Sequence, residues 1–99
     1  MAELVPSLDE VLEATSNQSG IPIKSLKMAK DHKTLRWRHI GIYVARKHNY
    51  SSLNKIAIVF GYNNHSPAYY AVRRIDDDFD KYEDDVNAVK AKLGITEGG

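Results

Sequence analysis

The sequence predicts an all-α fold, a single small domain of five to six helices with a helix-turn-helix at its centre. Apolar residues recur at helical spacing along most of the chain, and cap-type residues precede several of these stretches. A chain of 99 residues is long enough for one modest core and too short for two. We therefore expect one domain over residues 1–99, with flexible ends at residues 1–6 and 95–99.

The first helix is expected to begin after Ser7, because Ser7 and Glu10 form a capping box. Its apolar face is formed by Leu8, Val11 and Leu12. The pattern fades toward Gly20, and a short helix that starts at Pro22 follows.

Residues 29–34 have no apolar period and are predicted to be a basic loop. Thr34 is of the right type to cap the next helix, predicted over residues 35–48. One side of that helix carries Ile40, Tyr43, Val44 and Lys47. Trp37, near its start, is more typical of a core or rim anchor than of a platform for stacking bases.

Residues 51–75 read as a short helix, a tight turn and a longer helix. Ser51 or Ser52 can cap the first helix, and Gly61 ends it at a position that favours positive φ. The apolar face of this helix is formed by Leu53, Ile56, Ala57 and Phe60. The next three residues, 62–64, are predicted to make the turn.

The second helix of the pair is expected to be capped by Ser66, with Pro67 in its first position. Its buried stripe is predicted to contain Ala68, Ala71, Val72, Ile75 and Phe79. Two short helices about a glycine-containing turn match the helix-turn-helix, whose second helix can enter the major groove of DNA. An ordinary α-hairpin inside a small bundle is the alternative.

Residues 76–85 are rich in acids, so we expect the second helix to run away from DNA with its far end in solvent. Phe79 and Tyr82 continue a helical stripe through this run. A calcium loop is excluded, because no glycine lies between Gly61 and Gly94. A last short helix with apolar residues Val86, Val89 and Leu93 should stop at Gly94.

The formal net charge of +1 hides a strong asymmetry along the chain. Residues 1–21 hold four acids and no Lys or Arg. Residues 22–75 hold eleven Lys or Arg against Asp31 alone, a balance of +10, and residues 76–99 hold eight acids against three lysines. A basic block that includes a helix-turn-helix is typical of a face that binds phosphates, although a solvated surface of mixed charge is the alternative.

Composition and the absence of certain motifs argue against membrane, nucleotide-binding and metal-dependent functions. The chain lacks cysteine, a run of about 18 apolar residues and a signal-peptide pattern, which favours a cytoplasmic protein that does not enter a membrane. It has no GxxxxGK[ST] phosphate loop, and its histidines show no HExxH or comparable ligand spacing. We expect no enzyme activity, no cofactor and no metal site.

Residues 56–75 resemble the C-terminal DNA-binding domain of the bacterial replication initiator DnaA, whose signature runs roughly IG-x-x-FGGRDHTTV-x-x-A-x-x-KI. Residues in register with it are Ile56, Phe60, Gly61, His65, Ala71 and Ile75, and Arg74 replaces the lysine. The resemblance extends at lower similarity over residues 8–80, where Arg36, Arg38, Ala45, Arg46 and Leu53 also fall in register.

The chain departs from this signature within the turn. Tyr62 stands at the second glycine, Asn64 at the acid before the histidine, and Ser66 and Pro67 at the two threonines. Asn is suited to a bidentate contact with adenine, whereas an acid accepts from cytosine. We therefore expect a DNA sequence that is related to the initiator's box but distinct from it.

The resemblance implies binding of double-stranded DNA, with Lys30 at the register of the family's deepest minor-groove contact. Base contacts are predicted for Lys30, Asn64, His65, Ser66 and Tyr69. Phosphate contacts are predicted for Lys33, Arg36, Arg38, Arg46, Lys55 and Arg73, and Lys30 can also take that role.

Control of replication initiation or regulation of transcription is the expected role, with a replication or transcription protein as a further partner. ATP-driven origin melting is not expected of this chain, since the phosphate loop is missing. The main alternative is a protein-interaction module of the same fold that has lost DNA affinity. RNA binding is a weaker alternative, because no RNP-type or KH-type motif appears.

Overall fold

A computed structural model describes residues 5–49 and 51–95, and within them the chain forms helices without a strand. The elements are α1 (Leu8–Ser19), α2 (Ile23–Lys27), α3 (His32–His48), α4 (Leu53–Val59), α5 (Ser66–Asp77), the 3₁₀-helix η1 (Phe79–Lys81) and α6 (Glu83–Lys92). The all-α prediction is confirmed, and α4 and α5 form the predicted helix-turn-helix. Residues 1–4 and 96–99, which make up most of the ends predicted to be flexible, lie outside the described residues, as does Tyr50.

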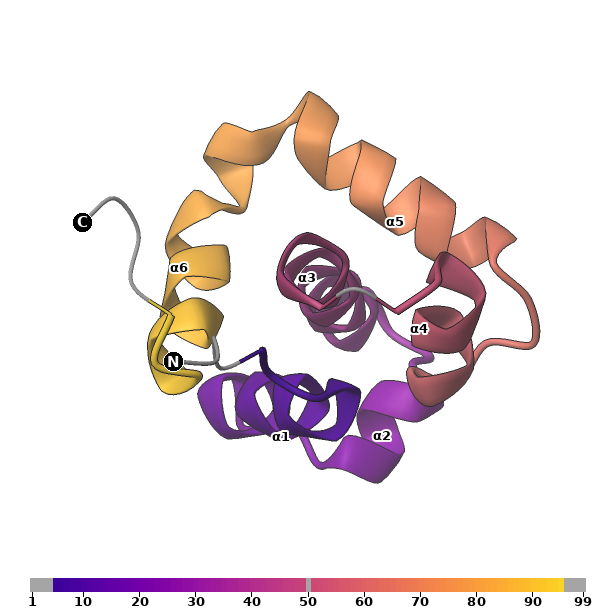
Figure 1. The fold of residues 1–99 in the computed structure, drawn as a ribbon, viewed down its shortest axis with the longest axis horizontal. Coiled ribbons are helices and arrows are strands. Elements are labelled where there is room, and N and C mark those ends of the chain that lie inside the picture. The colour runs from indigo at the N-terminus through magenta and orange to yellow at the C-terminus, as the bar shows by residue number, and fades with distance from the viewer. Residues whose placement is uncertain (1–4, 50, 96–99) are drawn as a thin grey trace.

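The longest helix, α3, is the centre of the domain, and the other helices surround it (Figure 1). Ile40, Val44 and Ala45 on α3 have no exposed surface. Every other α-helix packs against α3. The hydrophobic core is therefore built around α3. The packing of α4 and α5 against α3 sets the position of the helix-turn-helix.

Close packing around α3 depends on Gly41, which lies between α1 and α4. A Cβ atom added at Gly41 would lie 2.6 Å from the Phe60 ring and 2.8 Å from the Thr15 hydroxyl. Phe60 has no exposed surface. The ring that ends α4 thus occupies space that any larger residue at position 41 would need.

The start of α1 has the predicted capping box. The Ser7 hydroxyl accepts from the Glu10 amide at 3.1 Å, and the Glu10 carboxylate accepts from the Ser7 amide at 2.9 Å. Helix α1 ends at Gly20, whose φ is +76°. Just before the helix, the Pro6 carbonyl accepts from the Asn49 side chain at 2.7 Å.

The start of α3 differs from the prediction, because the helix begins at His32 and the loop before it is correspondingly shorter. Asp31 is the cap, and its carboxylate accepts from the Thr34 amide at 3.4 Å. Thr34 is instead a buried residue inside the first turn. Both residues are good caps three positions apart, and the helix takes the earlier one, which leaves the Thr34 side chain for the core.

The prediction that the acidic residues 76–85 extend the second helix into solvent is wrong. Helix α5 ends at Asp77, η1 turns the chain, and α6 begins at Glu83. Three acids in the first turn of α6 suit the positive end of the helix dipole. Because the chain turns back after α5, Asp85 of α6 pairs with Arg36 of α3, while Asp76, still within α5, pairs with Lys47 of α3.

Candidate nucleic-acid interface

The turn between α4 and α5 is a Schellman motif. The Tyr62 amide donates to the Ala57 carbonyl at 2.9 Å, and the Gly61 amide donates to the Ile58 carbonyl at 3.1 Å. Gly61 has a φ of +96°, as its place in the sequence predicts. Ser52 is the observed cap of α4, where its hydroxyl accepts from the Lys55 amide at 3.2 Å.

The first residues of α5 are open to solvent at the outer end of this turn. Asn64, His65 and Ser66 are all exposed. The Asn64 side-chain oxygen accepts from the Ser66 amide at 3.0 Å. The prediction that Ser66 caps α5 is wrong, because Ser66 is the first helical residue and His65 precedes it at the cap position without a side-chain cap bond. Asn64 satisfies the amide at the start of α5 instead.

The exposed face of α5 continues from these residues through Tyr69 and Arg73. Tyr69 is 46% exposed, and its hydroxyl accepts from an Arg73 guanidinium nitrogen at 3.2 Å. This hydrogen bond raises the pKa of Arg73 further above its ordinary value. Arg73 is thus a permanent cation held against the ring that precedes it by one helical turn.

The loop before α3 consists of residues 28–31, in place of the predicted 29–34, and we keep the name basic loop for residues 28–31 because Lys30 lies in it and Lys33 follows it. Lys30 in the loop and Lys33 in the first turn of α3 are both exposed. Asp31 is the single acid in residues 22–75. A hydrogen bond from Thr34 lowers the pKa of Asp31, which matches its role as the cap of α3.

The end of α2, where the basic loop begins, lies against the turn of the helix-turn-helix, although more than thirty positions separate Lys27 from Gly61 in the sequence. A Cβ atom added at Gly61 would overlap the Lys27 carbonyl, at the end of α2. The loop begins one residue after Lys27. In Figure 1 the α2 end and the α4–α5 turn accordingly occupy the same side of the domain.

Arg38 lies between these two segments and is only 5% exposed. Its Nε atom donates to the Leu26 carbonyl at 2.7 Å, and an Nη2 hydrogen goes to the Lys27 carbonyl. The guanidinium carbon is 4.2 Å from the centroid of the Tyr62 ring. In this conformation Arg38 does not present its guanidinium to solvent, where a phosphate would lie.

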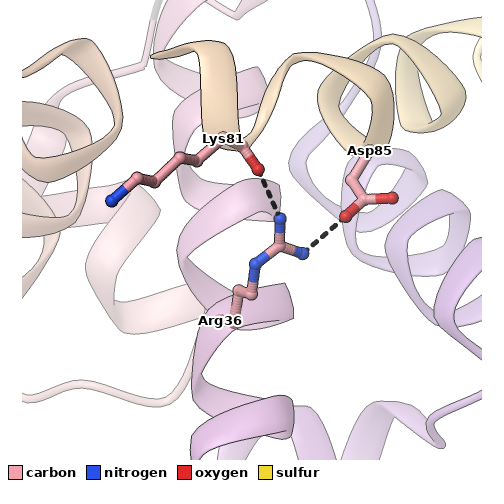
Figure 2. A network of polar contacts seen from close by, with 3 residues as sticks. All are labelled: Arg36, Lys81 and Asp85. Atoms are coloured by element: carbon pink, nitrogen blue, oxygen red, sulfur yellow. Dashed lines mark hydrogen bonds and ion pairs between the residues drawn. The ribbon is translucent and has the colours of Figure 1, made fainter. Parts of the chain in front are cut away.

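Arg36 points to the opposite side of α3. It donates to the Asp85 carboxylate at 2.5 Å and to the Lys81 carbonyl at 2.8 Å, as Figure 2 shows. Its guanidinium also lies 4.9 Å from the centroid of the Tyr82 ring. These partners belong to η1 and α6, so Arg36 faces away from the helix-turn-helix.

The other two cations of the predicted set are open to solvent. Arg46 lies near the end of α3 and Lys55 near the start of α4, and both are exposed. Of the predicted contacts, Lys30, Lys33, Lys55, Asn64, His65 and Ser66 are exposed and belong to the basic loop, the first turn of α3 or the helix-turn-helix. Tyr69 and Arg73 extend this surface along α5.

Two exposed residues of α5, Tyr70 and Arg74, were not among the predicted DNA contacts. Tyr70 is 68% exposed and packs edge-on against Tyr69, with ring centroids 5.7 Å apart. Arg74 is exposed one residue beyond Arg73. The available signal was helical spacing, because Ser66, Tyr70 and Arg74 follow one another at intervals of four.

His39 lies beneath this surface and is partly buried. Burial, together with the nearby charges of Arg74 and Arg38, lowers the pKa of His39 from 6.5 to about 4. The imidazole is therefore neutral at physiological pH. It adds no charge to the interface.

Within the described ranges, no helix is both long and apolar enough to cross a membrane. The same residues contain no group of three or more His, Asp or Glu placed to hold a metal ion.

Comparison with known families gives a match to the model described as the bacterial dnaA protein helix-turn-helix, over residues 8–75. The matched part includes α1 to α4 and nearly all of α5, hence the basic loop and the complete turn. It covers well over half of the chain. The chain therefore belongs to the DnaA helix-turn-helix family, which indicates DNA binding.

Proposed function

We propose that this domain binds double-stranded DNA with the first residues of α5 in the major groove. The observation that carries the proposal is the exposure of Asn64, His65 and Ser66 next to the basic loop. In a helix-turn-helix, the N-terminal residues of the second helix contact base edges. Tyr69, one turn further along, would complete the base-reading set.

The basic loop would reach the neighbouring groove or its phosphates through Lys30. Its side chain is exposed and begins three residues beyond the Lys27 carbonyl that packs on Gly61. A lysine enters a narrow minor groove less readily than an arginine, because its ammonium is more strongly hydrated. Phosphate contact is therefore as consistent with Lys30 as base contact.

The phosphate contacts are assigned to the exposed cations Lys33, Arg46, Lys55 and Arg73, with Lys30 as a fifth. Arg36 and Arg38 are given structural roles in place of the predicted phosphate contacts, because their guanidinium groups are engaged within the domain. Phosphate contacts set the position on the duplex, whereas base contacts select the sequence.

A domain of this kind would act in the control of replication initiation or in transcription regulation, by occupying sites related to those of the initiator. Occupying such a site blocks or marks it, and neither outcome requires catalysis by this chain. A replication or transcription protein would then be the further partner.

Selection of binding sites from random duplexes, followed by titration of the selected duplex, tests the proposal. Lys30→Glu should weaken binding by about tenfold at low salt, since it replaces an attraction with a repulsion at the DNA surface. Lys92→Glu is the matched control, because Lys92 is exposed on α6, across the domain from the α4–α5 turn in Figure 1. Equal weakening by both changes would contradict this placement of the interface.

The alternative function is a protein-interaction module that has kept the fold and lost DNA affinity. The observation that favours it is the exposure of two adjacent rings, Tyr69 and Tyr70, on α5. Tyrosines are common anchors in protein interfaces. Absence of duplex binding even at low salt would favour this alternative.

A further inference from the structure

We propose that Arg38 is a positioning residue that fixes the basic loop relative to the helix-turn-helix turn, so that both can engage one duplex together. The inference rests on the proposed function. It concerns a unit that we call the Arg38 clamp, which consists of Arg38, the Tyr62 ring and the carbonyls of Leu26 and Lys27.

The first half of the clamp is the end of α2. This helix has only five residues, and carbonyls at a helix end have no amide of their own helix to pair with. Arg38 supplies hydrogen-bond donors to the Leu26 and Lys27 carbonyls. A cation at this position also suits the negative end of a helix. Arg38 therefore satisfies the last carbonyls of α2 and fixes the backbone position from which the basic loop starts.

The second half of the clamp is the turn. The Tyr62 ring lies on the Arg38 guanidinium, with 4.2 Å between the guanidinium carbon and the ring centroid. The Schellman hydrogen bond from the Tyr62 amide to Ala57 holds the backbone beneath the ring. Gly61 allows the turn to approach the end of α2, because a Cβ atom at this position would overlap the Lys27 carbonyl.

Three segments thus meet at one buried cation: the end of α2, the middle of α3 and the turn. Lys30 follows Lys27 by three residues, and His65 follows Tyr62 by three residues. Each of these DNA-facing residues is therefore one short step from a clamped backbone position. If Lys30 and His65 are to contact two neighbouring parts of a duplex at the same time, the basic loop and the turn must keep a fixed position relative to each other.

The geometry of the clamp requires arginine. A guanidinium has donors in its plane for the two carbonyls and an open face for the ring, whereas an ammonium has neither the plane nor the face. Arg38→Lys keeps the charge and removes the geometry. This difference separates a clamp from a phosphate contact, because a phosphate contact would survive the change with much of its strength.

Three variants test the clamp: Arg38→Lys, Tyr62→Leu and, as the matched control, Tyr62→Phe, which keeps the ring face. Affinity is measured on the selected duplex and on random duplexes. Arg38→Lys and Tyr62→Leu should each lower the preference for the selected duplex by about tenfold, which corresponds to about 1.4 kcal/mol. Tyr62→Phe should leave this preference unchanged.

Amide hydrogen exchange is measured on the same proteins without DNA. Arg38→Lys and Tyr62→Leu should each speed exchange in residues 28–31 and in residues 62–66 alike, while the amides of α6 keep the parent rates. The double variant should be little worse than either single variant, since both remove one unit. Equal losses on selected and random duplexes, or exchange that changes in only one of the two segments, would overturn the proposal.

The two proposals fail in different ways. If the parent protein binds no duplex, the proposed function fails, and the exchange experiment still decides whether the clamp couples the two segments. If the parent binds a selected duplex and the preference is unchanged in Arg38→Lys and Tyr62→Leu, the clamp is refuted and the proposed function stands. Tyr62→Leu keeps the clamp testable if Arg38→Lys does not fold.

Discussion

At the scale of single residues, the Phe60 ring fills the space beside Gly41 and has no exposed surface. Phe60→Ala should lower the free energy of unfolding by about 3–5 kcal/mol, because it removes a buried ring and leaves a cavity at the centre of the core. Urea unfolding followed by helical circular dichroism measures this. Tyr70→Ala, at an exposed position, is the control and should change stability by less than about 0.5 kcal/mol. A Phe60→Ala protein as stable as its parent would contradict the packing described here.

His39 predicts a pH dependence of stability. Its pKa is lowered from 6.5 to about 4 in the folded protein, chiefly because burial disfavours the charged imidazole. Between those values the unfolded chain binds more protons than the folded one, so the free energy of unfolding should fall as the pH drops through this window. Above about 6.5 the contribution is fully present. His39→Gln should flatten the dependence between these pH values. Parallel curves for the parent and His39→Gln would refute the assignment.

At the scale of elements, local signals predicted the helix ends that depend on local chemistry. The Ser7 capping box, the Ser52 cap and the positive φ of Gly61 all involve residues within a few positions of one another. Where two signals competed, sequence reasoning had no means of choosing. Asp31 and Thr34 are both good caps, and in the structure Asp31 is the cap while Thr34 is buried.

The same limit applies to the candidate site. Arg36 and Arg38 have the same residue type and lie two positions apart, so a charge count treats them alike. Their partners are distant in sequence: Arg36 meets Asp85, and Arg38 meets the α2 carbonyls and Tyr62. The predicted contacts on α5, such as His65 and Tyr69, are exposed, because the start of a helix-turn-helix recognition helix is a local feature.

The start of α5 carries a prediction about specificity. Asn64→Asp keeps an oxygen that can accept from the Ser66 amide, so the helix start should be preserved. It replaces an amide group that can donate to adenine with an acceptor that suits cytosine. The preferred base facing position 64 should shift from adenine toward cytosine, by about 1–3 kcal/mol in relative affinity. Competition among duplexes that differ at one base pair measures the shift. An unchanged preference would mean that Asn64 supports the helix start and does not read a base.

At the scale of the whole molecule, the charge differs between two stretches of the chain: residues 22–75 have a balance of +10, whereas residues 76–99, which include η1 and α6, hold eight acids against three lysines. The basic loop and the α4–α5 turn lie on one side of α3, and η1 and α6 lie on the other (Figure 1). Two ion pairs join the acidic residues 76–85 to α3: Arg36–Asp85 at 2.5 Å and Lys47–Asp76 at 3.7 Å. A phosphate backbone should therefore be attracted to the first side and repelled from the second, which orients the domain before contact.

This separation gives a prediction for the salt dependence of binding. Counting all seven predicted cations gives a log–log slope of roughly −6, whereas the five exposed ones, without Arg36 and Arg38, give about −4.5. Arg46→Gln should reduce the steepness by about one unit, because it removes one phosphate contact. Arg36→Gln is the matched comparison on the same helix: it should leave the slope unchanged and lower stability by at most about 1 kcal/mol, since its ion pair is 35% exposed on each side. Titration of one duplex at four or five salt concentrations measures all three slopes. A shallower slope for Arg36→Gln would show that Arg36 contacts a phosphate. It would also mean that the contact between Arg36 and Asp85 opens when DNA binds.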